Sequence, residues 1–197
     1  MELAKEVCGK MTPKRCSWVD LNNPLYVEYH DNEWGVPVHN DDKLFEMLIL
    51  EGAQAGLSWA TVLKKREAYR KLFLNFDPKK IAEFSDLDLE RILEDASIIR
   101  NRLKIFSVRQ NAKVFLQIQS EYGSFDEYIW KWTARKQIKN KWKSLSELPS
   151  KTPLSDLISK DLKKRGMNFV GSTIIYAYMQ AIGIVDDHFQ DCWKSSA

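Results

Sequence analysis

The chain has 197 residues, of which 44% are hydrophobic and 29% charged, and its formal net charge at pH 7 is +3. This composition excludes a disordered chain and is that of an ordinary globular protein. The most apolar stretch, 169–185, is interrupted by Gly171, Gln180 and Gly183 and is shorter than a typical membrane span. We therefore expect it to form a buried helix and expect no contact with a membrane.

The amino-terminal segment 1–15 is charged from its second residue and lacks the apolar core of a secretory signal. Three cysteines are an odd number without compact disulfide spacing, which favours a reducing compartment and leaves Cys8 as a spare thiol. We expect a cytoplasmic protein with an N-terminal extension over 1–15 and a single helical domain over 16–197.

Helix signals recur along the chain, and strand signals are sparse. The predicted N-caps and first-turn residues are Asp41 or Asp42, Asp77 with Pro78, Ser85, Ser124 with Glu127, and Ser155. The last of these helices is expected to stop at Gly166. No internal repeat and no proline- or glycine-rich linker divides the chain, so the prediction is one compact all-α unit.

Four potential metal ligands lie near the two ends of the chain: Cys16, His30, His188 and Cys192. The three residues between His188 and Cys192 let both side chains reach one ion from a helical turn or a tight loop. A zinc ion with four protein ligands keeps no position for water, so it would be structural and would join the chain ends. Spacing alone also allows four packed or hydrogen-bonded side chains without a metal.

A carboxylate interrupts one apolar helical stripe, because Glu51 shares its predicted face with Leu44, Leu48 and Ala55. An unpaired buried carboxylate is costly, so Glu51 has a partner, takes up a proton, or faces a ligand pocket. Small residues follow it, and Trp59 stands about two turns beyond it. A structural glutamate bonded to a backbone amide or an arginine would give the same pattern.

Aromatic residues are dense in the segment that carries the first two candidate ligands: Trp18, Tyr26, Tyr29 and Trp34. Such clusters are usually core. Together with small residues and one carboxylate, they also suit a flat, electron-poor ligand such as a nucleobase. Basic clusters are compatible with a nucleic-acid surface, although solvated helix faces carry the same charges; they lie at 64–66, 79–80, 100–104, 131–143 and 160–165.

Several blocks of sequence follow one another in the order of a known family: Tyr29-His-Asp-Asn-Glu-Trp-Gly-Val-Pro37, Leu50-Glu-Gly-Ala-Gln-Ala-Gly-Leu-Ser-Trp59, Leu63-Lys-Lys-Arg66, Ile98-Ile-Arg100 and Lys163-Lys-Arg-Gly-Met-Asn-Phe-Val-Gly171. They closely resemble the DNA-3-methyladenine glycosylase I family, an offshoot of the helix-hairpin-helix DNA glycosylases. The resemblance runs from about Cys16 to Cys192. It implies a helical glycosylase fold with a helix-hairpin-helix element.

The resemblance also implies roles in a base pocket. Glu51 matches the carboxylate that hydrogen-bonds the excised base and is the expected catalytic residue. Trp59 matches the ring that stacks on the base, and Tyr29 matches a tyrosine of the pocket. The remaining expected wall residues are Tyr26, Trp18 and Trp34.

Two further elements are implied by the same resemblance. The four candidate metal ligands match structural zinc ligands, so one zinc ion is the expected cofactor. The segment 96–104 would be the hairpin that approaches the DNA backbone. This chain has Ser97 and Leu103 where related sequences can carry glycine, the residue that normally permits close backbone approach.

The implied activity is base excision repair by a hydrolase acting on N-glycosyl bonds. The enzyme would flip 3-methyladenine out of alkylated double-stranded DNA, release the free base and leave an abasic site, with 3-methylguanine as a weaker substrate. Because the methylated base is cationic, it is a good leaving group that an ionised Glu51 favours electrostatically. No lysine is assigned as a Schiff-base nucleophile, so we expect no strand cleavage, and we expect a monomer.

Two other classes of function remain to be weighed. In a zinc-dependent hydrolase the metal would activate water, which requires one of the four candidate ligands to be absent from the metal. A noncatalytic DNA-binding module would keep the fold without needing a pocket of the size of a base. The joint presence of Glu51, Trp59 and Tyr29 argues against that second class.

Overall fold

The computed structural model describes residues 13–196, so most of the expected N-terminal extension lies outside the described residues. Its helices are α1 (Pro24–Asn32), α2 (Asp41–Gln54), α3 (Trp59–Leu72), α4 (Pro78–Ala82), α5 (Asp86–Glu94), α6 (Arg102–Tyr122), α7 (Phe125–Trp130), α8 (Pro153–Lys164) and α9 (Ser172–Ala181). The shorter elements are η1 (Leu74–Phe76), η2 (Lys131–Thr133), η3 (Trp193–Ser196), β1 (Ile138–Lys139) and β2 (Val185–Asp186). The predicted helical fold is confirmed in outline, because this part of the chain is mostly helical and contains one short pair of strands.

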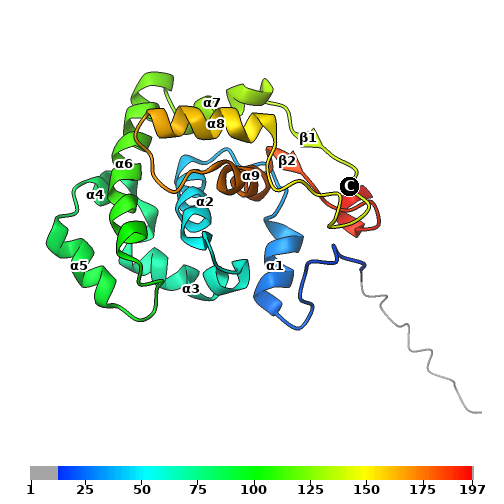
Figure 1. Ribbon diagram of the computed structural model, residues 1–197, viewed down its shortest axis with the longest axis horizontal. Helices are drawn as coiled ribbons and strands as arrows, with labels where there is room; N and C mark the ends of the chain where they lie inside the picture. The colour runs from blue at the N-terminus through cyan, green and yellow to red at the C-terminus, as the bar shows by residue number, and fades with distance from the viewer. Residues whose placement is uncertain (1–12, 197) are drawn as a thin grey trace, which may run out of the picture.

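Helices α2 and α9 form the centre of the bundle (Figure 1). They pack on each other. Helices α3, α6 and α7 also pack on α2, and α8 packs on α9. Every residue from Leu44 to Ala53 in α2 is buried, as expected for a helix enclosed on all sides. None of the helices within residues 13–196 is both long and apolar enough to cross a membrane.

The first predicted helix cap is wrong by one residue. Asn40 is the N-cap of α2, and its side chain accepts a hydrogen bond from the Lys43 N–H at 2.9 Å. Asp41 instead accepts from the backbone N–H groups of Phe125 and Asp126, both at 2.8 Å, at the start of α7. Asparagine and aspartate are similarly good caps, so the tertiary contact decides which one serves α2.

The later helix boundaries follow the predictions more closely. The side chains of Asp77, Ser85 and Ser124 cap α4, α5 and α7, respectively. Helix α8 begins earlier than expected, because Thr152 is its N-cap and exchanges hydrogen bonds with Ser155. The apolar stretch 169–185 contains α9, which is shorter than the stretch itself.

The two ends of the described chain meet on one side of the bundle (Figure 1). Strands β1 and β2 pair in parallel, with Ile138 opposite Val185. Beyond β2, the Trp193 N–H donates to the Lys14 carbonyl at 2.8 Å. This closure places the residues that follow β2 against the residues that precede α1.

Candidate functional site

A cavity of about 170 Å³ lies between α1, α2, α3 and α9. All six side chains expected in a base pocket line it: Trp18, Tyr26, Tyr29, Trp34, Glu51 and Trp59. A water molecule in the liquid occupies roughly 30 Å³, so the cavity has room for a small, flat ligand. Sequence reasoning did not assign Gln54 and Gln180 to the site, although both also line it.

Glu51 and Trp59 reach the cavity from two different helices. Helix α2 ends at Gln54, so the expectation that Trp59 continues the helix of Glu51 is wrong. A turn follows in which Gly56 has a φ of +78°, a conformation that favours glycine, and Ser58 then caps α3. Trp59 is the first residue of α3, and its ring lies 5.1 Å from that of Tyr29, centroid to centroid.

The carboxyl group of Glu51 is buried without a compensating charge. The side chain is 3% exposed, and no residue within 13–196 donates a hydrogen bond to its Oε2 atom. Burial raises the pKa of Glu51 to about 8, so the acid form predominates at neutral pH in the ligand-free cavity. A cationic ligand is the kind of partner that would restore the ionised form.

The alternative of a purely structural glutamate describes Glu33 and Glu46 better than it describes Glu51. The Arg66 guanidinium donates to both carboxylate oxygens of Glu33, at 2.7 and 2.8 Å, and to Glu46 at 2.6 Å. These three residues connect the end of α1 to α2 and α3, the helices that carry the cavity side chains. The arginine that a structural carboxylate needs is therefore bound elsewhere.

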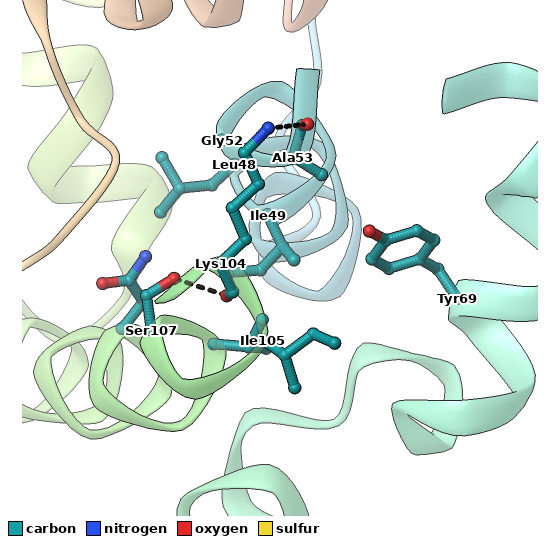
Figure 2. A pocket seen from close by; sticks show the side chains of 10 residues that line it. Leu48, Ile49, Gly52, Ala53, Tyr69, Lys104, Ile105 and Ser107 are labelled. Atoms are coloured by element: carbon teal, nitrogen blue, oxygen red, sulfur yellow. Dashed lines mark hydrogen bonds between the residues drawn. The ribbon is translucent and has the colours of Figure 1, made fainter. Parts of the chain in front are cut away.

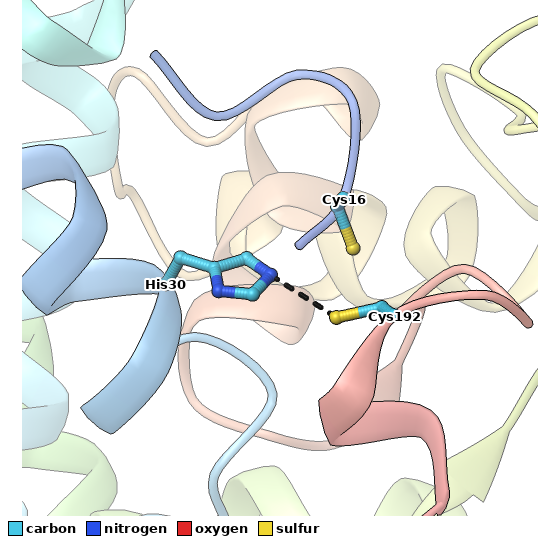
Figure 3. Close-up of side chains that lie close together, drawn as sticks. All are labelled: Cys16, His30 and Cys192. Carbon is cyan, nitrogen blue, oxygen red and sulfur yellow. Dashed lines mark hydrogen bonds between the residues drawn. The ribbon is translucent and has the colours of Figure 1, made fainter. Parts of the chain in front are cut away.

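Three of the four candidate metal ligands are close together and buried. The ligand atoms of Cys16, His30 and Cys192 all lie within 4.8 Å of one another (Figure 3). The Nε2 atom of His30 is 3.5 Å from the Cys192 sulfur. Cys192 follows β2 in a tight loop, in which its N–H donates to the Phe189 carbonyl at 2.8 Å.

The fourth candidate, His188, lies outside this group of three but next to it. Its ring centroid is 5.0 Å from that of His30, and its buried Nε2 atom has no hydrogen-bond partner among the described residues. The Nδ1 atoms of His30 and His188 each contact a carboxylate at 2.7 Å, from Asp31 and Asp186, respectively. Metal-bound histidines usually have such carboxylate partners, so the donor set fits a metal ion.

The candidate metal ligands lie directly behind the aromatic wall of the cavity. Trp18 has its ring 5.3 Å from that of His30, and the Trp34 ring is 4.7 Å from that of His188. The same two tryptophans line the cavity and contact each other at 4.8 Å. The position of this wall therefore depends on the side chains that would hold a metal.

The family model for methyladenine glycosylases matches residues 18–195. The chain belongs to the methyladenine glycosylase family. It is 50% identical over 179 residues to DNA-3-methyladenine glycosylase 1 of Escherichia coli, covering 91% of this chain and 95% of the relative.

Solved structures of the methyladenine glycosylase family share this fold. A crystal structure of 3-methyladenine DNA glycosylase I matches with a TM-score of 0.89 and 49% identity, over 91% of this chain and 98% of the other. A variant of such an enzyme in complex with 3-methyladenine matches with a TM-score of 0.85 and 34% identity, over 87% of this chain and 92% of the other.

In this member of the methyladenine glycosylase family, a buried lysine supports the loop between Glu51 and Trp59. The Lys104 ammonium donates to the carbonyl of Ala53 at 2.8 Å (Figure 2). It also donates to the carbonyl of Ala55 at 2.6 Å. These carbonyls belong to the end of α2, where the helix itself supplies no basic residue. The Lys104 ammonium of α6 therefore supplies hydrogen bonds to carbonyl groups at the C-terminal end of α2, the helix that carries Glu51.

Lys104 lies at the start of α6, directly after the turn that joins α5 to α6. Ser97 in that turn and Leu103 in the first turn of α6 both avoid positive φ, so the backbone does not require glycine at either position. The Leu103 side chain is 73% exposed. Serine at 97 and leucine at 103 are thus compatible with the local backbone. Both side chains are exposed on the surface of this segment.

Proposed function

We propose that this protein is a monofunctional DNA glycosylase that removes 3-methyladenine from alkylated double-stranded DNA. The observation that carries the proposal is a buried, unpartnered carboxylate in an aromatic cavity of base size. Support also comes from the related 3-methyladenine DNA glycosylases, one of which has been crystallised with 3-methyladenine. The products are free 3-methyladenine and an abasic site.

The cavity favours a cationic purine over a neutral one. Binding of the flipped base would place its positive charge beside Glu51. The carboxyl group would then release its proton to the solvent and accept a hydrogen bond from the base. Trp59 and Tyr29 supply aromatic surface that replaces part of the stacking lost from the duplex. The bond between the base nitrogen and the sugar carbon breaks with its electron pair going to the base, which leaves as a neutral purine. Water then adds to the cationic sugar carbon and loses a proton to the solvent.

The zinc site is proposed as a structural clip. Cys16, His30, His188 and Cys192 would hold the ion, with Asp31 and Asp186 orienting the two imidazoles. Bound zinc would supply cross-linking of the two chain ends and no catalysis. The residues that act on the base are those of the cavity in front of it.

The remaining features of the proposal concern the whole enzyme. Residues 16–197 would act as one monomeric domain in the cytoplasm, with 1–15 as an extension. The turn and helix start over 96–104 would face the DNA backbone as a helix-hairpin-helix element, with exposed Leu103 beside the phosphates. Activity on 3-methylguanine would be weaker than on 3-methyladenine.

The test uses duplex DNA treated with a methylating agent and chromatography of the released bases. The parent protein is expected to release 3-methyladenine and not 7-methylguanine. Glu51→Gln should slow this release by at least about tenfold, since a hydrogen bond to a charged group contributes on the order of 1.5–3 kcal/mol. Glu28→Gln, at an exposed position of α1, is the matched control and should retain full activity.

Two results would contradict the proposal. A folded, metal-loaded parent that releases no base would instead support a noncatalytic DNA-binding protein. A covalent complex with DNA trapped by borohydride would show an amine nucleophile and overturn the monofunctional assignment.

A further inference from the structure

A glutamine shares the cavity with Glu51. Gln180 lies near the end of α9 and is 8% exposed. In the sequence it is a polar interruption of the most apolar stretch of the chain, just as Glu51 interrupts the apolar stripe of α2. Both side chains line the same cavity, so the polar groups that face a bound base come from the two central helices.

The orientation of the Gln180 amide is determined by a buried carboxylate. Its Nε2 atom donates to Asp187 at 2.7 Å. Asp187 is fully buried and accepts three more hydrogen bonds, from the Tyr176 hydroxyl at 2.6 Å, Asn140 at 2.7 Å and the Trp142 indole at 2.7 Å. A carboxylate surrounded by four donors acts as an acceptor, so the amide must present its NH₂ group to Asp187.

The amide oxygen of Gln180 is consequently left for the cavity. No residue within 13–196 donates a hydrogen bond to this oxygen, and it is not sealed inside the protein. Reversal of the amide would place its oxygen against the Asp187 carboxylate and leave two acceptors in contact. The cavity therefore contains a neutral acceptor of fixed orientation in addition to the carboxyl group of Glu51.

We propose that Gln180 is a specificity-determining residue whose amide oxygen accepts a hydrogen bond from the exocyclic amine at position 6 of the base. The inference rests on the proposed glycosylase function and extends it. An amine at this position offers two hydrogens, one for each acceptor. A base with an oxo group at position 6 would instead place an acceptor against an acceptor and leave both without a hydrogen bond.

The test measures binding of two free bases, 3-methyladenine with an amine at position 6 and 3-methylhypoxanthine with an oxo group there, by titration of tryptophan fluorescence. The parent is expected to prefer 3-methyladenine. Gln180→Met keeps the side-chain length without a polar atom and should weaken binding of 3-methyladenine by about tenfold, the effect of one hydrogen bond. Binding of 3-methylhypoxanthine should remain the same or improve, so the ratio of the two affinities falls.

Tyr176→Phe is the matched control, because it removes a different donor from the same Asp187 and leaves the Gln180 amide in place. It should retain the parental preference, and thermal unfolding checks that both variants are folded. An unchanged preference in Gln180→Met, or an equal loss in Tyr176→Phe, would overturn the inference while the parent still releases 3-methyladenine from DNA. A parent that releases none overturns the proposed function itself.

Discussion

Glu51 occupies a position where an apolar side chain would be less costly to the fold. It lies in α2, where every residue from Leu44 to Ala53 is buried, and burial keeps its carboxyl group protonated in the absence of a ligand. The protonation state of Glu51 therefore depends on the charge of the ligand in the cavity. A neutral base leaves it as an acid, whereas a cationic base gives the carboxylate its counter-charge.

The stability of the protein should depend on pH through this residue. The pKa of Glu51 is about 8 in the folded protein against an ordinary value of 4.5, so between these limits the folded state binds a proton that the unfolded state does not. Stability due to this group is therefore present below pH 4.5 and is lost as the pH rises to about 8. Each pH unit in this window costs roughly 1.4 kcal/mol.

Glu51→Gln has no such proton and should be more stable than the parent at pH 8, although it is expected to be nearly inactive. Urea unfolding of both proteins at pH 6 and pH 8 measures this difference. Equal pH dependence of the two proteins would show that Glu51 is ionised in the ligand-free state.

At the scale of helices and loops, the loop between α2 and α3 sets the relative positions of two cavity side chains. It joins the carboxyl of Glu51 to the indole of Trp59, and it is held from α6 by Lys104. The lysine follows the turn that we propose faces DNA. Lys104 therefore links the loop of the base pocket to the helix that begins after this turn.

Lys104→Met keeps most of the aliphatic stem and removes the ammonium group. The carbonyls of Ala53 and Ala55 then lose their donor, which should reduce the free energy of unfolding by about 1.5–3 kcal/mol. Base release should also slow, because the loop is less well positioned. Lys113→Met, at an exposed position of the same helix, is the control. Wild-type stability and activity in Lys104→Met would refute this role.

Most of the helices and the candidate cavity residues could be predicted from the sequence, and the exceptions depend on contacts between distant parts of the chain. Helix starts such as Ser85 depend on neighbours a few residues away, so local patterns reveal them. Asp41 was assigned wrongly because its partners lie in α7, far along the chain. The roles of Lys104 and of Gln180 were missed for the same reason, since each is defined by contacts that exist only in the folded protein.

At the scale of the whole molecule, both chain ends contribute to one buried cluster of sulfur and imidazole groups. The cluster consists of Cys16, His30 and Cys192, with His188 beside it, and the rings of His30 and His188 contact the tryptophans of the cavity wall. Spacing in the sequence suggested Cys16, His30, His188 and Cys192 as candidate ligands. It could not predict which carboxylates and tryptophans contact the two histidines, because those contacts exist only in the folded protein.

Purified protein is expected to contain one zinc ion per chain, measurable by atomic emission. Cys192→Ala should lose the metal and be destabilised by on the order of 4 kcal/mol, the contribution of a ligand at a thousandfold excess over its dissociation constant. Cys8→Ala, which changes a cysteine outside the described residues, is the control. A metal-free parent of equal thermal stability to the variant would contradict the clip.

The walls of the cavity come from nearly the full length of the chain, from Trp18 before α1 to Gln180 at the end of α9. When the ribosome has synthesised the chain as far as α3, Glu51 and Trp59 are present but α9, which completes the cavity wall, is not. The nascent polypeptide therefore has no base site until synthesis is almost finished. For the same reason, a proteolytic fragment without α9 would lack one of the two central helices and, with it, the cavity wall that carries Gln180.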